Sequence, residues 1–189
     1  MGQLSMGQRL VINITTDGKI LANAYFHWDG YTQCAIEHIC KLIALHEWLD
    51  KADEFKNMPL KKKAIYMLEF LGAGITPEDF ELNEFPDIWT RAKNRNEGLI
   101  QVSDEQIKDA ENWAEGLVVI DIVNKTVDFD VFFYYDEGDL DEEEEKNPVE
   151  MPLPWNMSYP EFFKFADWSR HHTPNQLYWN SEQLCKFIE

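Results

Sequence analysis

The stretch RLVINITTDGKILANAYFH, residues 9–27, decides the fold. It contains Asp17-Gly18, a pair that tolerates the positive φ angles of a tight turn and can join two strands directly. On both sides of this turn every second residue is apolar, which is the period of a strand with one buried face. The sequence therefore predicts a β-hairpin whose core-facing residues are Leu10, Ile12, Ile14, Ile20, Ala22, Ala24 and Phe26.

Helices are predicted after this hairpin. Residues 32–51 contain neither glycine nor proline and repeat apolar side chains at helical spacing, so they predict a long, largely buried helix. Ser103 and Gln106 have the spacing of a capping box, which starts a helix. The same reasoning predicts helical segments over 61–71, from Thr76, over 86–95 and over 103–115.

A second hairpin is predicted from residues 117–123 and 126–135, joined across Asn124-Lys125. The first of these strands is apolar on both faces, as expected for a central strand. The second alternates apolar residues with Asp128 and Asp130, so one of its faces is expected to be exposed and acidic.

These elements predict a single α+β domain over residues 1–189, with two β-hairpins in a mainly antiparallel sheet packed by several α-helices. An acidic loop over 136–150 is expected to follow the second hairpin. A C-terminal helical region is expected over 158–189.

The charge of the chain restricts its partners. The 189 residues include 17 Lys and Arg against 35 Asp and Glu, which gives a net charge of −18. Residues 1–70 are balanced, whereas residues 101–189 contain six basic and 21 acidic side chains. A protein that binds nucleic acid without sequence preference neutralises phosphates with Lys and Arg, so direct binding of nucleic acid is not expected.

Several classes of protein are excluded by missing motifs. The three cysteines have neither metal-ligand spacing nor an even number, so reduced thiols and a cytoplasmic location are expected. No glycine-rich phosphate loop, nucleophile elbow or EF-hand order occurs, and no stretch is apolar enough to cross a membrane. We therefore expect no cofactor, no metal and no membrane partner.

One candidate site follows the first hairpin. The residues His27, Trp28, Asp29 and Tyr31 place a base, a carboxylate and two aromatic rings between a strand end and a helix start. They could bind a small ligand or carry hydrolytic chemistry. The sequence favours a structural role over these two, because Asp29 can cap the helix and aromatic rings anchor cores.

The second candidate site is acidic. It comprises exposed carboxylates of the second hairpin and of the run that follows, which are Asp128, Asp130, Asp136, Glu137, Asp139, Asp141, Glu142, Glu143, Glu144 and Glu145. One interpretation is a solvated, self-repelling loop. The other is a partner-binding surface, since carboxylates at alternate strand positions lie about 7 Å apart, similar to neighbouring phosphates of a nucleic-acid strand.

The first 50 residues carry a resemblance. The segments Met6-Gly7-Gln8-Arg9, Asp17-Gly18 and Tyr25-Phe26-His27-Trp28-Asp29-Gly30-Tyr31 resemble those of uncharacterised phage and prophage proteins, in which an N-terminal hairpin ends in a Tyr-x-His-Trp-Asp-Gly-Tyr segment. Proline commonly follows the tyrosine in those proteins, where this chain has Thr32. The resemblance transfers no chemistry, but it implies a phage context, in which small acidic proteins without enzyme motifs are often inhibitors of host defence, including anti-restriction and anti-CRISPR proteins.

The sequence thus leaves three functions open. The first is a non-enzymatic inhibitor that binds a basic, nucleic-acid-handling protein of the host through its acidic face, mimicking nucleic-acid charge. The second is a small-ligand-binding protein or hydrolase with a pocket around His27 and Asp29. The third is a structural or assembly protein of a phage particle. The oligomeric state does not follow from the sequence.

Overall fold

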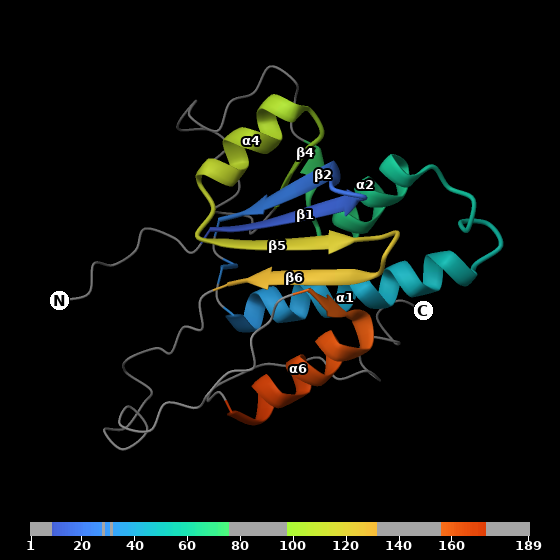
Figure 1. Cartoon of the computed structure of the whole chain (residues 1–189). Coiled ribbons are helices and arrows are strands. Elements are labelled where there is room, and N and C mark those ends of the chain that lie inside the picture. The colour runs from blue at the N-terminus through green and yellow to red at the C-terminus, as the bar shows by residue number, and fades with distance from the viewer. Residues whose placement is uncertain (1–8, 28, 31, 76–97, 132–155, 173–189) are drawn as a thin grey trace.

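A mixed sheet organises the chain in the computed structural model, which describes residues 9–27, 29–30, 32–75, 98–131 and 156–172 (Figure 1). Seven strands of this part of the chain follow the order β3-β4-β2-β1-β5-β6-β7. They are β1 (Leu10–Thr16), β2 (Lys19–Phe26), β3 (Gly74–Ile75), β4 (Leu99–Gln101), β5 (Gly116–Asp121), β6 (Thr126–Asp130) and β7 (Met157–Ser158). The helices are α1 (Thr32–Lys51), α2 (Leu60–Phe70), α4 (Asp104–Asn112) and α6 (Tyr159–His172).

The predicted first hairpin is confirmed. Strands β1 and β2 pair antiparallel from Leu10 opposite Phe26 to Thr16 opposite Lys19. The turn needs positive φ at both of its central residues, and Asp17 and Gly18 supply φ angles of 47° and 80°. A register shift after Ile14 places Thr15 opposite Ile20, and near this shift the predicted core residues differ: Ile20 is half-buried, whereas Leu21 belongs to the main apolar core.

The second hairpin is also confirmed, and it joins the first through a parallel pairing. Strands β5 and β6 pair antiparallel, while β1 and β5 pair in parallel from Leu10 opposite Gly116 to Thr15 opposite Asp121. Strands β3 and β4 form the other parallel pair, and the remaining pairs are antiparallel. The fold is therefore α+β with a mainly antiparallel sheet, as the sequence predicts.

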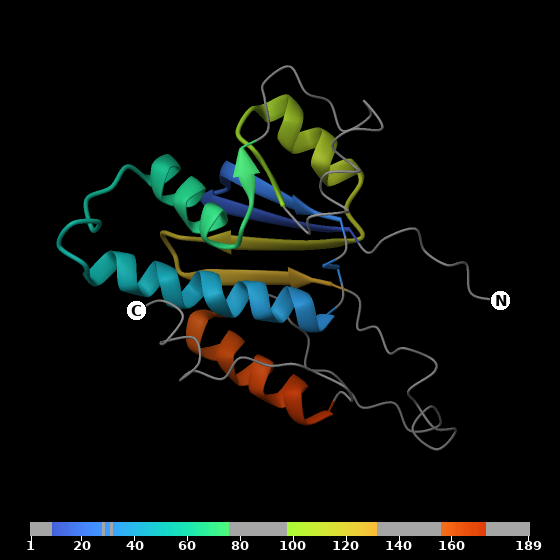
Figure 2. The same ribbon diagram turned by 180° about the vertical axis from the view of Figure 1, so that it is seen from behind.

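Helices cover the two faces of the sheet unequally. Helices α1, α2 and α6 pack on one face, which carries the main apolar core and includes Ile12 and Ile14 of β1 (Figures 1 and 2). On that side Phe129 of β6 packs against Phe162 and Phe165 of α6, with ring centroids 5.5–5.6 Å away. Helix α4 packs on the other face, where the fully buried apolar cluster contains Val11, Tyr25 and Ala110 alone among the described residues.

The helix boundaries lie close to the predicted ones. Helix α1 spans the predicted 32–51, and α2 begins and ends one residue before the predicted 61–71. Helix α4 is shorter than the predicted 103–115 and starts after Ser103, whose side chain accepts a hydrogen bond from Gln106 N at 3.2 Å. The C-terminal helical region is confirmed over 159–172.

Other predictions were wrong or lie outside the described residues. Strand β5 ends at Asp121 and not at Val123, because residues 122–125 form the turn and Lys125 has a φ of 55°. Its residues alternate between buried and half-buried instead of being buried on both faces, which shows that α4 leaves β5 partly uncovered. The predictions that lie outside the described residues are the helical segments over 76–95, strand residues 132–135, the acidic loop over 136–150 and the helical region over 173–189.

None of the helices in the described ranges is long and apolar enough to cross a lipid bilayer.

The cap of α4 leads to a stability prediction. Replacing Ser103 by Ala removes the side-chain acceptor of Gln106 N, so we expect the free energy of unfolding to fall by about 1 kcal/mol in urea denaturation. Ser103→Asp keeps an acceptor at this position and should lose much less. An alanine variant as stable as the aspartate variant would contradict a capping role.

Candidate functional site

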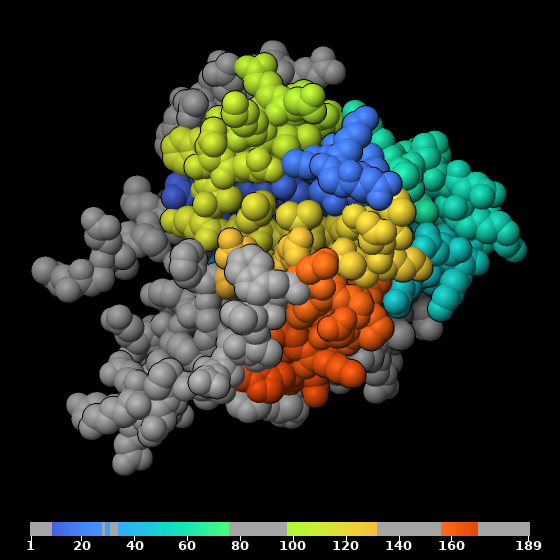
Figure 3. Space-filling view, viewed as in Figure 1, coloured from blue at the N-terminus to red at the C-terminus, as the bar shows by residue number. Residues whose placement is uncertain are grey.

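The exposed face of β6 carries the two carboxylates that the sequence singles out there. Asp128 and Asp130 are exposed, whereas Val127 and Phe129 between them are buried. Residues at alternate positions of a strand point to the same side of the sheet. Both carboxylates therefore lie on the side of the sheet that carries α4. Figure 3 shows this side of the molecule, with the surfaces of β5 and β6 between α4 and α6.

This acidic surface has half-buried aliphatic neighbours. Asp128 lies opposite Val119 and Asp130 lies opposite Leu117 in the pairing of β6 with β5. Side chains of directly opposed residues are about 4.5–5.5 Å apart at Cβ. Each carboxylate thus stands beside an aliphatic side chain that α4 leaves partly uncovered. We call Asp128, Asp130, Leu117 and Val119 the β5–β6 face.

Asp128 is held in position by the backbone. Its Oδ1 accepts a hydrogen bond from Asn156 N at 2.7 Å, at the residue before β7. The paired backbone of β5 and β6 fixes the strand that carries it. The carboxylate therefore remains exposed while its orientation is restrained, so it would lose less conformational freedom on binding than an unrestrained one.

Negative charge predominates in the segment that builds this side of the molecule. Residues 98–131 contain eight acidic side chains against Lys108 and Lys125. Arg9 neutralises Glu115 of this segment at 3.0 Å, whereas Lys125 pairs at 3.2 Å with Asp50 of α1, which lies outside the segment. The predicted site residues Asp136, Glu137, Asp139, Asp141, Glu142, Glu143, Glu144 and Glu145 lie outside the described residues.

The other predicted site has its polar residues engaged with different partners. His27 is 8% exposed, and its Nδ1 lies 3.1 Å from Tyr25 Oη. Asp29 Oδ2 lies 2.8 Å from His38 Nε2, and the His38 ring stacks on Phe26 with centroids 4.7 Å apart. Asp29 thus ties the connection after β2 to α1, which favours a structural role.

The rest of that site adds no chemistry. Trp28 and Tyr31 lie outside the described residues. In the described part of the chain no three His, Cys, Asp or Glu side chains are grouped so that they could hold a metal ion. Burial, with the nearby Asp29 and Glu37 carboxylates, raises the pKa of the Cys34 thiol to about 11, which disfavours a nucleophilic thiolate there.

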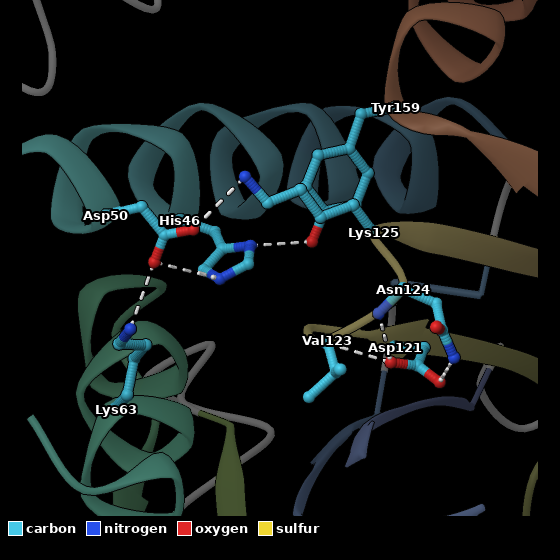
Figure 4. A network of polar contacts seen from close by, with 8 residues as sticks. All are labelled: His46, Asp50, Lys63, Asp121, Val123, Asn124, Lys125 and Tyr159. Atoms are coloured by element: carbon cyan, nitrogen blue, oxygen red, sulfur yellow. Dashed lines mark hydrogen bonds and ion pairs between the residues drawn. The ribbon is translucent and has the colours of Figure 1, made fainter. Parts of the chain in front are cut away.

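Sequence reasoning missed a polar network at the end of α1 (Figure 4). His46 Nδ1 lies 2.8 Å from Tyr159 Oη, and His46 Nε2 lies 3.5 Å from Asp50 Oδ1. The Asp50 carboxylate also pairs with Lys63 at 3.0 Å and with Lys125 at 3.2 Å. The network connects α1, α2, the turn between β5 and β6, and α6. The i,i+4 spacing of His46 and Asp50 is the one signal of it that the sequence contains.

The protonation states in this network follow from burial. Burial lowers the pKa of His46 to about 4, so its imidazole is neutral near pH 7. Because a carboxylate only accepts hydrogen bonds, Nε2 carries the proton that faces Asp50, and Tyr159 donates its hydroxyl proton to Nδ1. Burial also raises the pKa of Tyr159, while hydrogen bonds from Lys63 and Lys125 outweigh burial and hold the pKa of Asp50 below its usual range.

This network resembles a catalytic relay only in its residue types. His46 and Tyr159 are each 1% exposed, so a substrate cannot reach either side chain. What the arrangement does is fix four elements of the fold relative to one another.

The network predicts a dependence of stability on pH. The pKa of His46 rises from about 4 in the folded chain to its ordinary 6.5 on unfolding, so the unfolded chain binds the proton more tightly. The stabilisation is therefore complete above pH 6.5 and decreases as the pH falls toward 4. Between pH 7 and pH 5 we expect this residue to reduce the free energy of unfolding by about 2 kcal/mol.

Urea denaturation of the wild-type chain and of His46→Gln over this pH range measures the effect. Gln can accept from Tyr159 and donate to Asp50, but it does not titrate. The difference in pH slope between the two proteins isolates His46 from the other histidines. Equal slopes would show that His46 does not titrate with a lowered pKa.

Comparisons of the chain with models of known protein families, with curated proteins and with solved structures found no match.

Proposed function

We propose that this chain is an acidic, non-enzymatic inhibitor that occupies the nucleic-acid-binding surface of a basic host protein. The single observation that carries the proposal is the pair Asp128 and Asp130, which are exposed on one side of β6 and are held by its pairing with Val119 and Leu117 of β5. The resemblance of residues 6–31 to phage and prophage proteins supplies the context, in which the target is a protein of host defence.

The geometry of the β5–β6 face suits a cationic groove. Carboxylates at alternate strand positions repeat at about 7 Å, so successive ones can meet successive Lys or Arg side chains that bind phosphates in the target. Because the strand is already ordered, docking costs little conformational entropy in this part of the surface. The acidic run 136–145, which follows β6 in sequence, is proposed as the continuation of the same binding surface.

Charge and apolar contact have different parts in this binding. The net charge of −18 accelerates encounter with a basic partner and repels nucleic acid itself. Affinity comes mainly from groups that lose water at the centre of an interface. Leu117 and Val119, beside Asp130 and Asp128, are the described side chains placed to supply such contacts.

The test compares two neutralised variants of equal charge. Asp128→Asn with Asp130→Asn removes both negative charges and keeps the side-chain oxygen that Asn156 N needs. Asp53→Asn with Glu54→Gln removes two exposed charges from the turn between α1 and α2. Each immobilised protein is incubated with bacterial lysate at about 0.15 M salt, and retained proteins are quantified by mass spectrometry.

We expect the wild-type chain and the Asp53/Glu54 variant to retain the same basic nucleic-acid-binding protein. The Asp128/Asp130 variant should retain at least ten-fold less of that protein. A single-stranded oligonucleotide should displace the retained protein by competing for its groove, and raised salt should weaken retention. Equal retention by both variants, or retention that oligonucleotide does not affect, would refute the proposal.

A further inference from the structure

The interface between α4 and the sheet is lined with buried amides. Asn13 of β1 lies opposite Asn23 of β2, which in turn lies opposite Gln101 of β4. Gln106 of α4 covers the same side of the sheet, and all four side chains are nearly inaccessible to solvent. Helix α4 packs beside β2 and β4 in this region (Figure 1). Its contact with the sheet therefore combines these amides with the small apolar cluster of Val11, Tyr25 and Ala110.

Two of these amides have their orientation fixed by acceptors. Asn13 Nδ2 donates to Glu111 Oε1 at 2.8 Å, and Asn23 Nδ2 donates to the Ile107 carbonyl at 3.4 Å. A carboxylate and a carbonyl cannot donate, so turning either amide over would place oxygen against oxygen. The oxygen of each amide must then point away from its α4 partner.

Those two oxygens lack donors. Asn13 Oδ1 and Asn23 Oδ1 are shielded from solvent, and neither has a hydrogen-bond partner among residues 9–27, 29–30, 32–75, 98–131 and 156–172. The residues that carry them are 3% and 0% exposed. A buried acceptor without a donor is destabilising by about 1–3 kcal/mol, and folded proteins supply a donor in nearly every case.

The register brings the two acceptors within reach of one small donor. Asn13 and Asn23 are directly opposed on adjacent strands, with Cβ atoms about 4.5–5.5 Å apart. A water molecule has two O–H groups and commonly satisfies buried polar groups in this way. We propose that a bound water donates one hydrogen bond to Asn13 Oδ1 and one to Asn23 Oδ1, forming an internal hydration site between α4 and the sheet.

An alkali cation is the competing occupant. It would need several more oxygen ligands and a compensating charge. The carboxylate in contact with the amides is that of Glu111, and its Oε1 already accepts from Asn13. A neutral donor fits this arrangement better, because the amides and a water require no further charge.

The test is NMR spectroscopy of the full chain labelled with ¹⁵N. Cross-peaks are expected between water and the side-chain amide protons of Asn13 and Asn23, with opposite signs in NOESY and ROESY spectra. That sign pattern identifies a water that remains bound longer than the protein tumbles and distinguishes it from proton exchange.

Variants locate the water. Asn23→Leu replaces an acceptor with apolar atoms of similar size and should abolish the water cross-peak at Asn13. Asn23→Ser keeps a polar oxygen and leaves space for the water, so the cross-peak at Asn13 should persist. This variant decides the question if the leucine protein does not fold. Asn57→Leu, an equivalent change at an exposed turn residue, should leave both cross-peaks unchanged.

Three results would overturn the proposal. The first is the absence of water cross-peaks at Asn13 and Asn23 in the folded wild-type chain. The second is a cross-peak at Asn13 that survives in folded Asn23→Leu or disappears in folded Asn23→Ser. The third combines missing water cross-peaks with a melting temperature that is higher in K⁺ or Na⁺ than in tetramethylammonium at equal ionic strength. That combination would assign the site to a cation.

Discussion

Residues 10–15 of β1 and residues 116–121 of β5 pair in parallel across about a hundred residues of sequence. Arg9 closes one end of this pairing, since its carbonyl accepts from Glu115 N and Gly116 N and its guanidinium pairs with Glu115. Thr15 closes the other end by accepting from Ile122 N. Because side chains alternate along β1, Ile12 lies on the face of the main apolar core and Asn13 lies under α4. A shift by one residue would exchange the apolar and the polar faces of the sheet.

The consequence for function is that the two faces have different chemistry. Three helices cover the apolar face and leave no strand of the hairpins unprotected there. On the opposite face α4 is the helix that the described residues provide; it packs beside β2 and β4, and residues of β5 and β6 there are half-buried or exposed. In the described part of the chain, the β5–β6 face is exposed or half-buried because α4 does not extend over these two strands. The contacts that keep it rigid lie elsewhere, in the core behind β6 and in the network around His46.

The features that could be predicted from the sequence are those that depend on residues close to one another in the chain. The alternation around Asp17-Gly18, the unbroken run 32–51 and the spacing of Ser103 and Gln106 each specify an element without reference to distant residues. The alternation of Asp128 and Asp130 with apolar neighbours likewise predicted the exposed carboxylates. Strands β3, β4 and β7 have only two or three residues, too few for any period to be visible. Long-range partners were equally hidden: His46 and Tyr159 are 113 residues apart, and Asp29 binds His38 although His27 is nearer in sequence.

In one row of residues across the sheet, the kind of polar side chain differs between the strands under α4 and the strand beyond it. The register aligns Gln101, Asn23, Asn13, Val119 and Asp128 across β4, β2, β1, β5 and β6. Under α4 the polar members are neutral amides, which can be buried at modest cost when they are hydrogen-bonded, whereas an unpaired carboxylate there would be far more costly. Beyond the edge of α4 the polar member becomes Asp128, which is exposed. Solubility would be served by acidic side chains anywhere on the surface, and it does not require Asp128 to be restrained by Asn156 N. The bond from Asn156 N gives Asp128 a structural role at the residue before β7, and in the function proposed above the same restraint would lower the entropy that this carboxylate loses on docking.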